Sequence, residues 1–148
     1  MENLKKAIVF GGCGKRSRKT IHSLLENEYL VVIIDDLSHS QHPKNWPPEE
    51  NVWDHKNLVF YEEDMIKFMN EENMFDLVHW DVVIHRAKVS HLDNHADELI
   101  ANTLLDAHFF KWVRKMDKIP AVIITNQNTQ VSRDLTRLLQ LPFQPTFQ

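Results

Sequence analysis

Short apolar runs alternate along the chain with longer segments in which apolar residues recur every three or four positions. Residues 6–10 form the first run, and residues 29–34 form a second that is continuous and rich in β-branched side chains. Such runs predict buried strands of a parallel sheet, because both faces of that kind of sheet are covered. Between them, residues 15–27 carry apolar positions at helical spacing and predict a helix.

The same alternation continues to the end of the chain. Three further strands are predicted at 58–61, 81–85 and 121–125, and three further helices at 65–72, 96–116 and 133–140. Ser132 is placed to cap the last of these helices. The helix at 96–116 is apolar on nearly every side, which indicates burial against more than one neighbour. Residues 38–56 contain three of the six prolines and no periodicity, so we expect a long loop there.

This order of elements is typical of an α/β fold. We predict a Rossmann-type doubly wound parallel sheet of about five strands with helices on both faces. Residues 1–140 are assigned to a single nucleotide-binding domain and residues 141–148 to a C-terminal tail with two prolines. A chain of 148 residues with 43% hydrophobic and 26% charged residues is within the range of one globular domain.

Charge and cysteine content narrow the classes of partner. A net charge of −4 gives no overall attraction to nucleic acid or to an anionic membrane, and no apolar run is long enough for a membrane span. The start of the chain lacks the pattern of a signal peptide, and the single cysteine, Cys13, fits a reducing compartment. We therefore expect a cytoplasmic protein.

All three glycines of the chain lie in residues 11–14, although typical usage would scatter about ten along it. Gly11 permits a tight turn from strand to helix, and Gly14 lets the backbone approach a pyrophosphate at the helix N-terminus. Asp35 ends the second strand 21 positions after Gly14, where it can accept hydrogen bonds from an adenosine ribose. The combination predicts a dinucleotide site. The alternative is that the glycines only make a turn and Asp35 only ends a strand.

Residues 9–40 resemble the NAD-dependent epimerase/dehydratase family of extended short-chain dehydrogenases, which act on sugar nucleotides. The Gly-Gly-Cys-Gly turn and the segment Val-Val-Ile-Ile-Asp-Asp-Leu-Ser-His-Ser carry the resemblance, which continues more thinly through Glu-Asp-Met-Ile, Val-Ile-His-Arg-Ala and Asn102 to about residue 125. It implies NAD as the cofactor. The residues to which it gives cofactor contacts are Gly11, Gly14, Arg16, Ser17, Asp35, Asp36, Asp64, Met65 and Ala87.

The glycine motif departs from the family pattern at two positions. Ser17 stands where the family has a third glycine, and Arg16 replaces an apolar residue. The start of the helix is basic, which either neutralises a pyrophosphate or 2′-phosphate or is simply solvated. The basic residues concerned are Lys15, Arg16, Arg18 and Lys19. Asp35 would repel a 2′-phosphate, so NAD is favoured over NADP.

The catalytic pair of the resembled family, a tyrosine followed four residues later by a lysine, is missing. Tyr29 and Tyr61 are followed at that distance by Ile33 and Met65. Residues 125–129 replace the family's serine-rich segment, with Thr125 and Thr129 as candidates only if the register shifts, and the substrate domain is absent from the sequence. We therefore assign no catalytic residue and expect no epimerase or dehydrogenase activity from this chain alone.

Other chemistry-bearing residues are interpreted as structural. His91 and His95 can share a helix face, but no third ligand accompanies them, so no metal site is predicted. We expect the loop histidines, His39 and His42, to be solvated and His85 to be packed or hydrogen-bonded. Cys13 is interpreted as a small filler of the glycine turn, with a thiol activated by the helix N-terminus as the alternative.

Three functional hypotheses remain open. The first is a catalytically degenerate NAD-binding protein derived from a sugar-nucleotide epimerase or dehydratase. The second is a structural or assembly protein that forms homo-oligomers through the helix at 96–116, with the fifth strand as an uncovered sheet edge for pairing. The third is the cofactor half of an enzyme that a second polypeptide completes.

Overall fold

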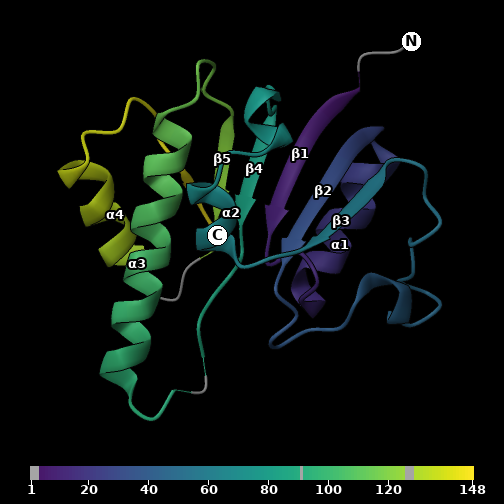
Figure 1. The fold of residues 1–148 in the computed structure, drawn as a ribbon, viewed down its shortest axis with the longest axis horizontal. Helices are drawn as coiled ribbons and strands as arrows, with labels where there is room; N and C mark the ends of the chain where they lie inside the picture. The colour runs from purple at the N-terminus through teal and green to yellow at the C-terminus, as the bar shows by residue number, and fades with distance from the viewer. Residues whose placement is uncertain (1–3, 91, 126–128) are drawn as a thin grey trace.

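The computed structural model describes residues 4–90, 92–125 and 129–148. The described chain contains a six-stranded sheet in which every neighbouring pair is parallel, in the order β3-β2-β1-β4-β5-β6 (Figure 1). The strands are β1 (Lys5–Phe10), β2 (Tyr29–Asp35), β3 (Leu58–Glu62), β4 (Val82–His85), β5 (Ala121–Ile124) and β6 (Thr146–Phe147). This arrangement confirms the predicted Rossmann-type α/β fold.

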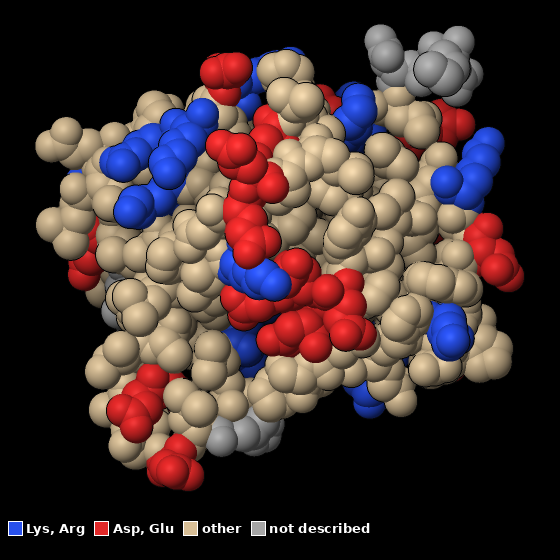
Figure 2. Space-filling model, viewed as in Figure 1, with Lys and Arg blue, Asp and Glu red and all other residues tan. Residues whose placement is uncertain are grey.

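Helices cover both faces of the sheet and enclose two apolar cores. The helices are α1 (Lys15–Glu26), α2 (Met65–Asn70), α3 (His95–Arg114) and α4 (Thr129–Leu138), with short 3-10 turns η1 (Pro43–Asn45) and η2 (Met74–Leu77). One core lies between the sheet and α1, and the other between the sheet and α2, α3 and α4. Figure 1 shows α3 and α4 side by side, away from α1. None of the described helices has the length and apolar content of a membrane span. Figure 2 shows charged side chains on the face viewed in Figure 1, with the acidic ones gathered near its centre.

The central strands are continuous apolar runs because each contributes to both cores. In β1, Ile8 and Phe10 enter the core beneath α3, whereas Val9 enters the core beneath α1. In β2, Val32 and Ile33 divide between the two cores in the same way. Successive side chains of a strand point to opposite faces, so in a strand covered on both sides every position faces an apolar core.

The C-terminal residues correct the predicted sheet edge. Thr146 and Phe147 pair in parallel with Ile123 and Ile124, so β5 has a neighbour on each side and is not the uncovered edge that the sequence led us to expect. The sheet therefore has six strands instead of about five. A two-residue strand after two prolines is too short to show a period in the sequence, and its pairing depends on β5 being already in place.

The last helix begins at Thr129, so the predicted cap at Ser132 is wrong. Ser132 lies inside α4, and its hydroxyl donates a hydrogen bond to Asp106 Oδ2 on α3 at 2.8 Å. A serine before an apolar run is a cap signal only when its side chain turns back to its own backbone. Here the contact between two helices determines where that side chain points.

The long helix α3 is buried along only part of its length. Its C-terminal half packs against α2, α4 and the sheet through Leu105, Phe109, Phe110 and Val113. Nearer the N-terminus, Leu99, Ile100 and Leu104 are 40%, 59% and 53% exposed. The expectation of burial against several neighbours therefore holds for one half of α3, and the other half presents an apolar surface.

The loop between β2 and β3 is held against α1 by a buried cation. The Arg18 side chain is 6% exposed, and its Nη1 lies 2.7 Å from Glu50 Oε2. The guanidinium also lies over the Trp46 ring, 5.0 Å from the centroid, and His22 Nε2 lies 2.8 Å from the Glu50 carbonyl oxygen. Arg18 thus fixes the loop, which excludes it from the phosphate contacts suggested for the basic start of α1.

Candidate functional site

The turn between β1 and α1 packs closely against the segment that follows β4 and against β2, and its first two glycines are needed for these two approaches. Gly11 has a φ of +74°, and a Cβ placed on it would lie 2.7 Å from the Ala87 backbone nitrogen. A Cβ on Gly12 would lie 2.8 Å from Ile33 Cγ2. Gly11 also donates its N–H to the Ile34 carbonyl at 2.8 Å. The fold itself therefore accounts for these two glycines.

Gly14 is different, because the fold does not require it. It is the N-cap of α1 with extended backbone angles, and a Cβ there would meet only the Gly11 carbonyl oxygen, at 3.8 Å. No side chain caps α1. The helix N-terminus therefore opens onto space above Gly14, which is the arrangement that accepts a phosphate group.

Ser17 takes the place of the third glycine without a polar penalty. It is buried, and its hydroxyl donates a hydrogen bond to the Gly11 carbonyl oxygen at 3.1 Å. This bond gives the buried hydroxyl a partner and links the first turn of α1 to the glycine turn. Arg16, one residue earlier, is exposed and borders the cavity described below.

The Asp35 carboxylate is oriented by three hydrogen bonds at the end of β2. Oδ2 accepts from the Cys13 backbone N–H at 3.0 Å, and Oδ1 accepts from the Leu37 N–H at 2.9 Å and the Ser40 hydroxyl at 3.1 Å. A carboxylate has about four acceptor positions, so one remains for a ribose hydroxyl. Asp35 therefore joins β2 to the glycine turn and faces the same groove.

Two adjoining cavities of about 620 and 330 Å³ lie at the carboxyl ends of the strands. Both border the glycine turn and the segment after β4, where the sheet order changes direction from β1 to β4. Ligands of doubly wound folds bind at this kind of position. The predicted cofactor residues all line this groove: Gly11, Gly14 and Ala87 both cavities, Arg16 and Ser17 the larger, and Asp35, Asp36, Asp64 and Met65 the smaller.

The residues beside Asp35 in the smaller cavity also have local structural roles. Asp36 Oδ1 accepts from the Ser38 N–H and hydroxyl, at 3.0 and 2.7 Å. Asp64 caps α2 by accepting from the Lys67 N–H at 3.0 Å, and Met65 is buried beneath it. Hydrogen bonds within the protein thus hold the carboxylates of Asp36 and Asp64 in place at this cavity.

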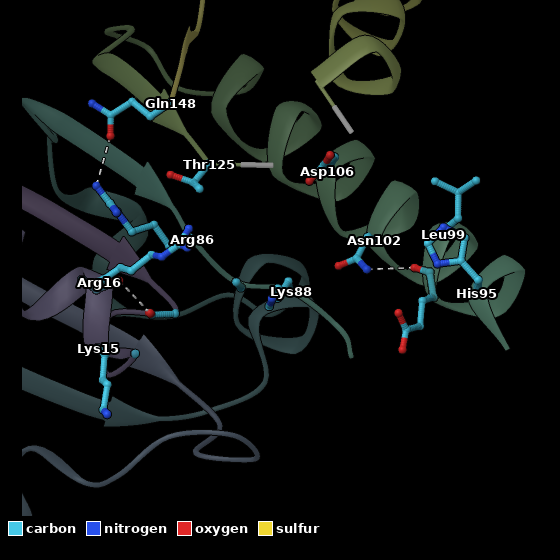
Figure 3. Close-up of a pocket in the computed structure, with 15 residues that line it drawn as sticks. Lys15, Arg16, Arg86, Lys88, His95, Leu99, Asn102, Asp106, Thr125 and Gln148 are labelled. Carbon is cyan, nitrogen blue, oxygen red and sulfur yellow. Dashed lines mark hydrogen bonds between the residues drawn. The ribbon is translucent and has the colours of Figure 1, made fainter. Parts of the chain in front are cut away.

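Sequence reasoning missed the basic wall of the larger cavity after β4. Figure 3 shows Arg86 beside Arg16, with Thr125 and Gln148 beyond them. Arg86 Nη2 donates to Gln148 Oε1 at 3.1 Å, whereas Arg86 Nε and Thr125 Oγ1 are buried without a hydrogen-bond partner. Burial, and then the charge of Arg16, lower the pKa of Arg86. The signal was present in the sequence, since Arg86 and Lys88 flank Ala87.

A buried polar network lies behind the same cavity. His85 Nε2 is 2.9 Å from Asp106 Oδ1, and Ser132 donates to the other oxygen of Asp106. The Ala87 N–H donates to His85 Nδ1 at 3.2 Å, so Nδ1 is the acceptor and Nε2 carries the proton. The prediction that His85 is a hydrogen-bonded core residue is confirmed. Ser132 bonds to the aspartate instead of the imidazole, so this is not a serine nucleophile paired with a base.

Asn102 fixes the backbone after β4. Its Oδ1 accepts from the Val89 N–H, and its Nδ2 donates to the Val89 carbonyl and to the Glu98 carbonyl, all at 2.8 Å. This pair of bonds to one residue holds the segment that carries Arg86 and Lys88 against α3. Asn102 therefore shapes the larger cavity from its wall.

The remaining predictions have clear outcomes where the structure describes the residues. Cys13 is fully buried, and burial together with the nearby Asp35 raises its pKa, so the filler role is confirmed and the activated thiol is wrong. His91 lies outside the described residues, and His95 is exposed at the start of α3. His42 is not simply solvated, because its Nδ1 accepts from the Lys44 N–H and its ring packs against Trp53 and Phe60.

Comparison with solved structures places this geometry among known folds. The epimerase Mth375 of Methanothermobacter thermautotrophicus has a TM-score of 0.66 at 21% identity over 84% of this chain. The UDP-Glc/GlcNAc 4-epimerase of Campylobacter jejuni has a TM-score of 0.67 at 17% identity over 82% of it. The chain shares its fold with sugar-nucleotide epimerases.

A third solved structure with this fold contains the cofactor. The enzyme WbmG of Bordetella bronchiseptica, solved in complex with NAD, has a TM-score of 0.65 at 16% identity over 84% of this chain. The chain spans 35%, 37% and 38% of the lengths of the Methanothermobacter, Campylobacter and Bordetella proteins respectively. No protein-family model matches the sequence, and no curated protein is similar enough to match it.

Proposed function

We propose that this chain is a nucleotide-binding protein that holds an adenine dinucleotide, NAD, in the groove at the glycine turn and does not itself carry out epimerase chemistry. The observation that carries the proposal is the open N-terminus of α1 above Gly14, which adjoins the oriented carboxylate of Asp35. The first accepts a pyrophosphate and the second a ribose, and a dinucleotide contains both.

The adenosine and the pyrophosphate of the dinucleotide would occupy the groove at the glycine turn. The adenosine would occupy the smaller cavity, with the ribose on Asp35 and the base near Asp64 and Met65. The negative charges of Asp35 and Asp36 disfavour a 2′-phosphate, so NAD is preferred over NADP. NAD supplies hydride-transfer chemistry when bound, and these residues would bind and orient it.

The proposal of binding without chemistry has its support in the larger cavity. No tyrosine is among the described residues that line it, and the sequence contains no tyrosine followed four positions later by lysine. The family that the sequence resembles uses that pair to move the substrate proton.

The proposal is tested by replacing Gly14 with alanine. In the unchanged protein, NAD at about 100 times its Kd stabilises the fold by about 2.7 kcal/mol, which raises the melting temperature by about 5–10 °C. The Gly14→Ala protein folds, because its Cβ has room, but the methyl group occupies the space of the phosphate and the shift is lost. Thermal unfolding with and without NAD measures both.

The matched control is Lys19→Ala, on the same helix, since Lys19 is exposed and borders neither cavity. It should keep the full shift. Asp35→Ala is a poorer test, because it also removes three hydrogen bonds within the protein. An unchanged shift in Gly14→Ala, or no shift with NAD or NADP in the unchanged protein, would contradict the proposal.

A second candidate function is that of a self-associating scaffold. The exposed Leu99, Ile100 and Leu104 on α3 form an apolar surface that a second copy of the chain would cover. We expect light scattering to give a dimer mass for the unchanged protein and a monomer mass for Ile100→Lys, with equal melting temperatures at low concentration. A monomer at high concentration in both proteins would exclude this candidate.

A further inference from the structure

The wall of the larger cavity gathers positive charge from two distant parts of the sequence. Two cations come from the start of α1 and two from the segment after β4; they are Lys15, Arg16, Arg86 and Lys88. Among the described residues, neither Arg16 nor Arg86 has a carboxylate within ion-pair distance. Two acidic residues, Glu98 and Asp106, also border the cavity.

Among the described residues, neither acid forms an ion pair with the four cations of this wall. The oxygens of Asp106 are bonded to His85 and Ser132 in the buried network. Glu98 lies on α3, and its Oε1 accepts from the Leu92 N–H at 3.1 Å. In Figure 3 the residues of α3 lie across the cavity from the two arginines. The cavity thus retains an excess of positive charge on the side of the glycine turn.

The arrangement of Arg16 and Arg86 is unfavourable without an anion. Two guanidinium groups repel each other, and burial of Arg86 weakens the screening by water. Arg86 Nε and Thr125 Oγ1 are both buried without a partner in this wall. Buried polar atoms of this kind usually have a partner such as water or a ligand. An anionic group between the arginines would remove the repulsion.

We propose that the larger cavity binds the terminal phosphates of an adenosine polyphosphate such as ATP. The inference rests on the proposed nucleotide site and names the group at its far end. With adenosine in the smaller cavity and the inner phosphates above Gly14, the chain of phosphates continues toward Arg16, Arg86 and Lys88. Arginine binds phosphate oxygens through two parallel N–H donors, and lysine adds a point charge.

This wall fits phosphate better than nicotinamide. The oxidised nicotinamide ring carries a positive charge, and four cations around the cavity would repel it. The carboxamide of that ring offers no charged acceptor to a guanidinium, whereas a phosphate gains charge-assisted hydrogen bonds. NAD would therefore bind through its adenosine and pyrophosphate alone, and a polyphosphate would use the whole groove.

Calorimetric titration of the full chain with ATP, ADP and NAD in EDTA tests the inference. We expect ATP to bind at least about tenfold more tightly than NAD, since each charge-assisted contact is worth roughly tenfold or more. Arg86→Gln and Lys88→Gln should each weaken ATP roughly tenfold to a hundredfold and leave NAD unchanged or tighter. The control Lys19→Gln, an exposed cation of α1 outside both cavities, should change neither.

The possible failures are distinguishable. If NAD binds as tightly as ATP, the inference is overturned and the nucleotide site stands. The same holds if the ratio of ATP affinity to NAD affinity in Arg86→Gln and Lys88→Gln equals the ratio in the unchanged protein. If none of the three nucleotides binds, the proposed function fails and the inference fails with it. Lys88 is exposed, so Lys88→Gln retains its circular dichroism spectrum and decides the matter even if Arg86→Gln does not fold.

Discussion

Replacing Gly11 with alanine is expected to destabilise the protein by about 3–5 kcal/mol, a large share of the 5–15 kcal/mol typical of a domain. The φ of +74° is strained for any residue with a Cβ. The methyl group would also lie 2.7 Å from the Ala87 nitrogen, and a backbone atom cannot move aside as a flexible side chain can. Urea unfolding followed by circular dichroism measures the loss.

The control for this prediction is the same substitution three residues later in the same turn. Gly14→Ala meets no atom closer than 3.8 Å and keeps a φ of −65°, so it should cost only about 1 kcal/mol or less. Equal stabilities for Gly11→Ala and Gly14→Ala would show that the turn does not have the close contact with Ala87 described above.

Replacing Asp106 with alanine is expected to cost about 2–4 kcal/mol, because it removes the acceptor at the centre of a buried network. His85 is 1% exposed and would keep its Nε2 proton with the Asp106 carboxylate gone. The hydrogen bond from Ser132, which joins α4 to α3, would be lost as well. The free energy of unfolding in urea gives the magnitude.

A double substitution separates this network from the packing around it. His85→Phe with Asp106→Leu leaves no imidazole donor without an acceptor, so the pair should be less damaging than the sum of the two single substitutions. Strict additivity, or a loss below about 0.5 kcal/mol for Asp106→Ala, would show that the network does not stabilise the core.

The segments read most accurately from the sequence are those whose structure depends on local pattern and strong burial. The runs at residues 6–10 and 29–34 gave β1 and β2 almost to the residue, because strands buried on both faces admit only apolar side chains. The glycine turn was found because its backbone geometry restricts the residue type, and Asp35 was found because it directly follows the second apolar run. A positive φ and a close backbone approach leave few choices of residue.

The nine predicted cofactor residues lie on one groove for a topological reason. The carboxyl ends of parallel strands meet at one edge of the sheet, so residues that follow β1, β2, β3 and β4 come together there. The order of strand and helix in the sequence was enough to predict this. Which ligand the groove holds was not determined by that order.

The features that sequence alone left open involve contacts between distant segments. Arg16 and Arg18 look alike in the sequence, yet Arg18 is buried against Glu50 and Trp46 while Arg16 meets Arg86 at the cavity. The two residues are about half a helical turn apart, so they point to nearly opposite sides of α1, and Arg18 is the one that faces the β2–β3 loop.

The sequence by itself determined a doubly wound sheet, its central strands and the glycine turn with its acidic partner. Only the tertiary structure decided that β6 covers β5, that Ser132 bonds to Asp106, and that cations from α1 and from the end of β4 share one cavity. The physical reason is that strand pairing, side-chain hydrogen bonds between helices and electrostatic fields depend on distances in space. The sequence pattern shows only which positions are apolar enough to be buried and which glycines allow a tight turn.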